Sequence, residues 1–212
     1  MKSTFLTISQ PARASYVIKK SKFIADIAPV SNAAASKGML AQLTAATPKA
    51  NHHCYAYRLV ENPPAERFSD DGEPVGTAGK PLLEILHHHQ LENTLIVVTR
   101  YFGGIKLGAG GLIRAYAQAA NVAVAQTTLC EKTLARQLTI SLDYPQLNKL
   151  RSFLDQQQLP ILKTTYTEQV TITTAVPVAQ VSTFQARVTE RLTGQAQYQL
   201  GAECYLTSPP QP

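Results

Sequence analysis

Cysteine and tryptophan are scarce in this 212-residue chain, which has three cysteines and no tryptophan. Cys54, Cys130 and Cys204 are odd in number and widely spaced, so they predict neither a disulfide framework nor a CxxC half-site for a metal. Such sparing use of cysteine is typical of the reducing cytoplasm. We therefore expect no disulfide-stapled fold, no zinc site and no other cofactor.

Long apolar runs are also missing. No stretch approaches the roughly 20 apolar residues that are needed to cross a bilayer. The N-terminus lacks the apolar segment of a signal peptide. With 44% hydrophobic residues there is still ample material for packed cores, and only residues 207–212 (TSPPQP) are predicted to form a flexible tail. We expect a cytoplasmic protein without a membrane partner.

The chain has no dense basic run, although its net charge is +6. Residues 1–130 hold 13 Lys and Arg against 8 Asp and Glu (+5), whereas residues 131–212 hold 7 against 6 (+1). A mild positive excess favours acidic partners such as RNA, the ribosome or an acidic protein. It does not indicate a dedicated nucleic-acid binder, and we expect no sequence specificity for DNA.

Glycine is concentrated between Glu66 and Tyr116, a segment that holds most of the 11 glycines together with several lysines and arginines. Glycine beside cations usually marks backbone that turns sharply or comes close to a ligand. A negatively charged ligand fits this setting best. Two blocks carry the signal, FSDDGEPVGTAGKP (68–81) and VVTRYFGGIKLGAGGLIR (97–114).

These blocks resemble the IMPACT/YigZ family, which shares an acidic DDGEP-like turn, a strand ending in R-Y/F-F-G-G and a glycine-rich helix start. SKFI (21–24) and HHCYAY (52–57) support the resemblance. It implies an N-terminal IMPACT-like domain over residues 1–130, an α/β sandwich similar to the second domain of a small-subunit ribosomal protein. It also implies a link to translation, because the two halves look like consecutive domains of elongation factor G and eukaryotic relatives regulate amino-acid-starvation signalling.

Hydrophobic periodicity predicts an α+β protein. In the first half, Leu95–Val98 is an apolar run typical of a doubly covered strand, Ser31 is expected to cap a helix, and the helices are expected on one face of a sheet. Residues 127–135 lose periodicity and are predicted to be a linker. Residues 131–206 then show the order strand, helix, strand, strand, helix, strand of a ferredoxin-like βαββαβ domain, with Asp143 expected to cap its first helix.

The glycine-rich blocks predict an anion-binding cleft. Unpaired N–H groups at a helix start carry partial positive charge, and small residues let a phosphate approach them. Alternatively, the glycines only permit left-handed backbone conformations and close packing of the helix on the sheet. The sequence is neither a Walker A motif nor a proper GxGxxG. The expected binding residues are Lys80, Arg100, Gly103, Gly104, Lys106, Gly108, Gly110, Gly111 and Arg114.

A possible acidic site comprises Asp70, Asp71 and Glu73, and three uses stay open for it. These residues can pair with Arg100, support a tight turn, or act in metal binding or proton transfer. Tyr55, Tyr57, Tyr101 and Phe102 interleave with cations, as base stacking on single-stranded RNA requires, although core packing is a competing use.

The sequence supports three hypotheses about function. The first is a non-enzymatic regulator or binding protein linked to translation, which engages RNA, the ribosome or an acidic partner through the basic cleft. The second is a small phosphate-handling or hydrolytic enzyme that uses Arg100 and Lys106 with Asp70 or Asp71, although no complete set of nucleophile, base and orienting group is recognisable. The third is a protein-interaction module whose contact surface is the ferredoxin-like half.

Overall fold

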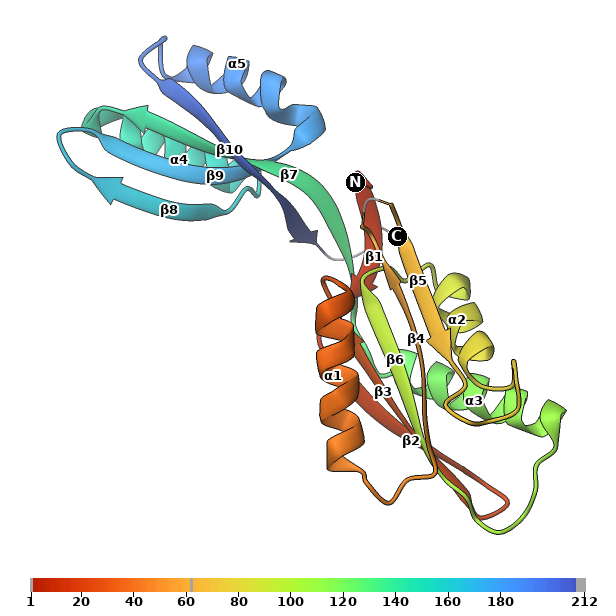
Figure 1. Cartoon of the computed structure of the whole chain (residues 1–212). Coiled ribbons are helices and arrows are strands. Elements are labelled where there is room, and N and C mark those ends of the chain that lie inside the picture. The colour runs from red at the N-terminus through yellow and green to blue at the C-terminus, as the bar shows by residue number, and fades with distance from the viewer. Residues whose placement is uncertain (1, 62, 209–212) are drawn as a thin grey trace. The chain divides into compact units, whose positions relative to one another are not determined.

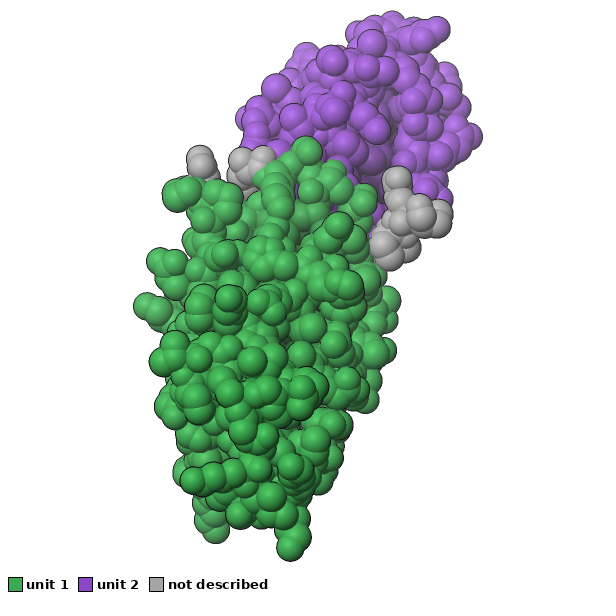
Figure 2. Space-filling view, turned by 90° about the vertical axis from the view of Figure 1, so that its right-hand side faces the viewer, with its two compact units in different colours: residues 1–131, 209–212 green, residues 132–208 purple. Residues whose placement is uncertain are grey.

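The computed structural model describes residues 2–61 and 63–208. Its contacts divide the chain into two compact units, one comprising the described residues up to Glu131 and the other Lys132–Ser208 (Figure 2). Within the described ranges, no helix combines the length and the apolar character that crossing a membrane requires.

The first unit is built on a five-stranded antiparallel sheet with the order β2-β3-β6-β4-β5 (Figure 1). The central strand β6 contains the Leu95–Val98 run, whose side chains are at most 1% exposed, as the sequence predicts. The strands of this unit are β1 (Thr4–Ile8), β2 (Ala12–Ile18), β3 (Ser21–Pro29), β4 (His52–Leu59), β5 (Ala65–Ser69) and β6 (Thr94–Tyr101).

Helices cover both faces of this sheet. α2 (Gly79–His88) and α3 (Ala109–Val124) pack against the face that carries Ile96 and Val98, whereas α1 (Ala33–Ala46) packs near Leu95 and Val97 on the other face (Figure 1). The expectation of helices on one face is therefore wrong, because successive apolar residues of a strand point to opposite sides and each side needs a cover.

The start of α1 also lies one residue later than predicted. Asn32 is the N-cap, and its side-chain oxygen accepts a hydrogen bond from the main-chain N–H of Ala35 at 2.8 Å. Ser31 precedes the cap. Serine and asparagine are both favoured N-cap residues, and the backbone conformation places Asn32 at that position.

The second unit has the predicted βαββαβ order. Its sheet runs β8-β9-β7, with β10 also paired to β7, and α4 and α5 bury their apolar sides together with the residues of β7 and β9. The elements are β7 (Leu129–Leu142), α4 (Leu147–Gln156), β8 (Ile161–Tyr166), β9 (Val170–Pro177), α5 (Val181–Arg191) and β10 (Gln197–Ser208), with 3₁₀ turns at Tyr144–Gln146 and Val178–Gln180.

Three sequence-based boundaries differ from the structure. The predicted linker 127–135 is mostly strand, because β7 begins at Leu129 and runs on without a break, with β1 as a further partner. Asp143 precedes a 3₁₀ turn rather than α4, and its side chain makes no capping bond within the described chain. β10 continues through Thr207 and Ser208, which the predicted tail includes, and residues 209–212 lie outside the described residues.

Candidate functional site: a polar pocket between two loops

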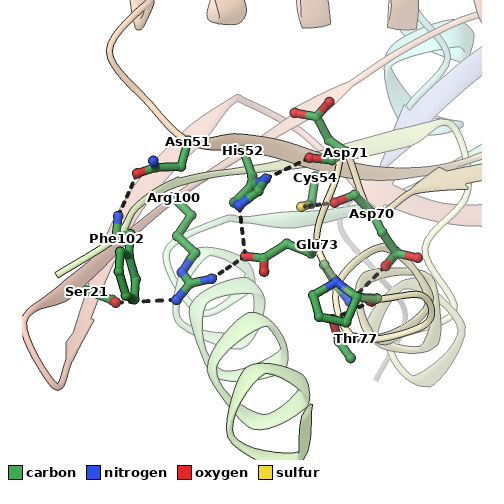
Figure 3. Close-up of polar contacts among 12 residues, drawn as sticks. Ser21, Asn51, His52, Cys54, Asp70, Asp71, Glu73, Thr77, Arg100 and Phe102 are labelled. Carbon is green, nitrogen blue, oxygen red and sulfur yellow. Dashed lines mark hydrogen bonds and ion pairs between the residues drawn. The ribbon is translucent and has the colours of Figure 1, made fainter. Parts of the chain in front are cut away.

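The acidic and glycine-rich blocks of the sequence meet at one end of the first unit's sheet. Arg100, near the end of β6, lies between the acidic turn (residues 70–78) and the glycine segment (residues 102–111) (Figure 3). These segments enclose a pocket of about 450 Å³. It is lined by Asn51, His52, Glu73, Pro74, Arg100, Phe102, Lys106, Leu107, Gly108, Ala109 and Leu112.

A buried ion pair forms the floor of this pocket. Arg100 is 5% exposed, and its Nη1 donates to Oε1 of Glu73 at 2.5 Å (Figure 3). The hydroxyl of Tyr116 donates to the same oxygen at 2.7 Å. Of the three carboxylates that the sequence offers to Arg100, the structure selects Glu73. Burial of both charges together avoids the large cost of leaving either unpaired.

Aromatic rings flank the guanidinium group of Arg100. Its Cζ lies 5.3 Å from the ring centroid of Phe23 and 5.5 Å from that of Phe102, both within the range of cation–π attraction. Phe23 is fully buried, but Phe102 is 46% exposed. The Nε of Arg100 is buried and has no hydrogen-bond partner among the described residues. The ring of Phe102 is thus partly exposed to solvent, and the Nε–H group of Arg100 makes no hydrogen bond within the described residues.

His52 and Cys54 lie beside this ion pair on β4. The Nε2 of His52 is 3.9 Å from Oε1 of Glu73, and its Nδ1 is 2.7 Å from the carbonyl oxygen of Asp71. Burial raises the pKa of the Cys54 thiol to about 12, an effect that its hydrogen bond to Tyr116 only partly opposes. Burial likewise raises the pKa of Tyr116. The thiol is therefore protonated and unreactive at neutral pH.

The carboxylate of Asp70 is fully engaged by the backbone. Its Oδ1 accepts from the N–H groups of Ala78 and Gly79 at 2.9 and 2.8 Å, and its Oδ2 accepts from Gly76 at 2.8 Å. Asp70 thereby satisfies the first N–H groups of α2, which has no cap of its own at Ala78. The geometry fits the turn-forming use of Asp70 rather than proton transfer.

Asp71 also supports the turn. Its Oδ2 accepts from the main-chain N–H of His53 at 2.6 Å, while Gly72 and Gly76 adopt the positive φ angles of 83° and 76° that reverse the chain. Only Glu73 of the three acidic residues lines the pocket. Within the described ranges, no group of three or more His, Cys, Asp or Glu side chains is placed to hold a metal ion.

The glycine segment is held by close packing at Gly103. A Cβ at this position would lie 2.0 Å from the main-chain carbon of Lys20, in the turn between β2 and β3, so only glycine fits. Its N–H donates to the hydroxyl of Ser21 at 3.2 Å. Gly104 and Gly108 follow with φ angles of 81° and 72°.

Gly108 is the N-cap of α3, and no side chain of the described chain caps this helix. The start of α3 contributes Gly108 and Ala109 to the pocket lining, and the first N–H groups of an α-helix have no partner within the helix. Lys106 lies next to them, and no ion pair to Lys106 forms among the described residues. A helix start, a lysine and a buried arginine thus converge on one cavity.

The other predicted cations lie elsewhere. Arg114 lines a second groove, and Lys80 is exposed in the first turn of α2 and does not line the pocket. Gly110 and Gly111 belong to the first turn of α3 but likewise do not line it. Asn51 was not anticipated from the sequence: its Oδ1 accepts from the N–H of Phe102 at 2.8 Å and so fixes the start of the glycine segment.

The fold and the pocket define a two-unit α+β protein whose first unit carries an IMPACT-type loop pair. Residues 19–124 match the Impact N-terminal domain, and residues 140–195 match a domain of unknown function (DUF1949). The chain belongs to the IMPACT family.

Similar proteins cover most of the chain. IMPACT family member YvyE of Bacillus subtilis is 36% identical over 206 residues, covering 97% of this chain and 95% of the relative. IMPACT family member YigZ of Escherichia coli is 37% identical over 182 residues, covering 85% and 89%. A solved structure titled "Crystal structure of an hypothetical protein" superimposes with a TM-score of 0.64 at 35% identity, covering 95% of this chain and 98% of that one.

Proposed function

We propose that this chain is a non-enzymatic regulator linked to translation, and that it binds single-stranded RNA through the pocket between the acidic turn and the glycine segment. The single observation that carries the proposal is the exposed ring of Phe102, stacked beside the Arg100 guanidinium at the mouth of a pocket that also holds Lys106. Aromatic rings beside cations bind single strands because every base has a face to stack and every nucleotide carries a phosphate.

The charge of the pocket supports an anionic ligand. Glu73 is neutralised by Arg100, so Lys106 and the open N–H groups of α3 set the sign at the mouth. His52 also lines the pocket. The family resemblance supplies the link to translation.

Acid–base chemistry by the acidic turn has less support. Both oxygens of Asp70 accept main-chain hydrogen bonds, and Asp71 holds the backbone of β4. The Cys54 thiol is buried and protonated. A general base must lie within hydrogen-bond reach of its substrate, and neither Asp70 nor Asp71 lines the pocket. The pocket is therefore better suited to holding a phosphate than to cleaving one.

Fluorescence anisotropy with a labelled single-stranded RNA of mixed sequence tests the proposal. We expect Phe102→Ala to weaken binding roughly 5- to 150-fold, which corresponds to the loss of about 1–3 kcal/mol for one stacked base. Lys106→Ala is expected to lower the slope of log K against log salt by about 0.7, the value for one phosphate contact of a single strand.

The chain offers matched controls for both variants. Phe68→Ala removes a phenylalanine that is 47% exposed on the edge strand β5, and Lys37→Ala removes an exposed lysine from α1 on the other face of the sheet. Both controls are expected to bind like the unmodified protein. Equal affinity of Phe102→Ala and Phe68→Ala, or no RNA binding by the unmodified chain at low salt, would refute the proposal.

A further inference from the structure

A second groove shares the lining residue Leu107 with the pocket and lies along another side of α3. It has a volume of about 550 Å³, within the range of about 300–1,000 Å³ that is usual for ligand sites. Its walls come from the end of β2, the turn after it and one side of α3. The lining residues are Tyr16, Ile18, Lys19, Leu107, Gly111, Arg114, Ala115, Ala117, Gln118 and Asn121.

The pocket and the groove share Leu107. On α3, Ala109 and Leu112 face the pocket, whereas residues two or three positions further on, Arg114 and Ala115, face the groove. At 3.6 residues per turn, Arg114 projects to a different side of the helix from Ala109 and Leu112. The two sites therefore lie side by side around the start of α3, with Leu107 as the ridge between them.

Two unpaired cations line the groove. Lys19 and Arg114 are both exposed, and neither makes an ion pair or a hydrogen bond to a side chain of the described residues. Arg114 extends back along α3 towards its start, since a Cβ on Gly110 would lie 3.7 Å from its Nη1. The described part of the chain contributes no Asp or Glu to the lining of the groove.

An aromatic ring accompanies these cations, as in the pocket. Tyr16 is half-buried and pairs across the strands with Phe23, so its ring lies on the face of the sheet that α3 covers. Phe102 and Lys106 thus line the pocket, Tyr16, Lys19 and Arg114 line the groove, and Leu107 lines both. Each of the two cavities therefore has an aromatic ring and at least one cation, just as each nucleotide of a strand has a base and a phosphate.

We propose that the groove is a second subsite for the same single strand: RNA crosses Leu107, and Lys19 and Arg114 hold the phosphates that follow the nucleotide in the pocket. This inference rests on the proposed function and extends it from one nucleotide to a path. Both cations are available without breaking a native contact, and the absence of acidic lining favours a chain of phosphates.

The experiment compares a short and a long strand on the full-length protein. An oligonucleotide of about three nucleotides fills the pocket alone, whereas one of about 12 nucleotides, within the usual footprint of single-strand sites, also reaches the groove. The double variant Lys19→Ala/Arg114→Ala is expected to weaken binding of the long strand about tenfold or more, to lower its salt slope by about 1.4, and to leave the short strand unaffected.

The matched control is Lys22→Ala/Lys37→Ala, which removes the same charge. Lys22 pairs with Val17 and alternates with the buried Phe23, so it lies on the opposite face of the sheet, as does α1 with Lys37. If the double variant and this control bind the long strand equally, or if the double variant weakens both strands alike, the second subsite is wrong while the pocket proposal stands.

Two further outcomes separate the subsite from the proposed function. Failure of both strands to bind the unmodified protein overturns the proposed function itself. Displacement of the long strand by poly-glutamate, with the same dependence on Lys19 and Arg114, shows that the groove takes an acidic protein and overturns the RNA path.

Discussion

The two loops that form the pocket are built on opposite principles. In the acidic turn, the carboxylates of Asp70, Asp71 and Glu73 all bind partners within the protein. These carboxylates therefore support the fold rather than a ligand. In the glycine segment, Lys106 and the first N–H groups of α3 have no side-chain partners among the described residues. The more charged loop is therefore the scaffold, and the less charged one offers the free donors.

This contrast separates stability from binding. Substitutions of Asp70 and Glu73 in the acidic turn should lower the free energy of unfolding, because each one removes the hydrogen-bond partner of groups inside the protein. Substitutions of exposed side chains in the glycine segment should change ligand affinity and leave stability nearly unchanged. If substitutions of exposed side chains in the glycine segment lowered stability, or substitutions in the acidic turn changed only affinity, this distinction between the two loops would be wrong.

The largest effect is expected for Glu73→Ala, which leaves the Arg100 guanidinium buried without its partner. Breaking a buried pair in this way costs about 3–5 kcal/mol, and urea denaturation followed by circular dichroism measures it. In the double variant Glu73→Ala/Arg100→Met neither charge remains, so most of the lost stability should return. A double variant as unstable as the single one would mean that the ion pair is not what Glu73 contributes.

An intermediate effect is expected for Asp70→Ala, which removes the acceptor of three main-chain N–H groups at the start of α2. The expected loss is about 2 kcal/mol, the upper end for an N-cap. Asp71→Ala is the comparison, because Asp71 accepts one main-chain bond and its side chain is 49% exposed. Equal melting temperatures of the two variants would contradict the structural role of Asp70.

The smallest effect is expected for the labelling of Cys54 when an alkylating reagent is added to the native protein. The reaction is run at about pH 8, near the pKa of an ordinary thiol. Cys54, whose pKa is raised to about 12, should stay unlabelled, while the partly exposed Cys204 reacts. Because the folded pKa of Cys54 lies above its usual 9.0, the stability that this thiol contributes is complete below pH 9 and is lost as pH rises towards 12. Mass spectrometry after timed labelling measures how fast each cysteine is alkylated. Rapid labelling of Cys54 would show that the acidic turn opens readily.

Much of the fold follows from local pattern. The apolar Leu95–Val98 run is typical of a covered strand, and the alternation in residues 137–142 indicates a strand with one buried face. What the sequence leaves undetermined is which face each helix covers. The apolar side chains of α1 and α2 look alike in sequence, and only the full register of the sheet assigns them to Val97 or to Val98.

The site shows the same limit. The glycine pattern predicts where the chain turns, and Gly104 and Gly108 do have positive φ angles. It does not predict where long side chains end. Gly111 and Arg114 both line the groove rather than the pocket, because the rotation of the helix turns them away from the side that Ala109 and Leu112 occupy. Nor does composition reveal that Glu73, rather than Asp70 or Asp71, meets Arg100, since that depends on how the turn folds back.

The contact at Gly103 has a mechanical consequence. Main chain touches main chain there, since even a methyl group would overlap the backbone of Lys20. The loop that bears Lys106 and the hairpin tip that bears Lys19 are thereby clamped together without an adjustable side chain between them. The backbone positions from which Lys106 and Lys19 extend are therefore held at a fixed spacing, and a bound strand would have to fit that spacing instead of changing it.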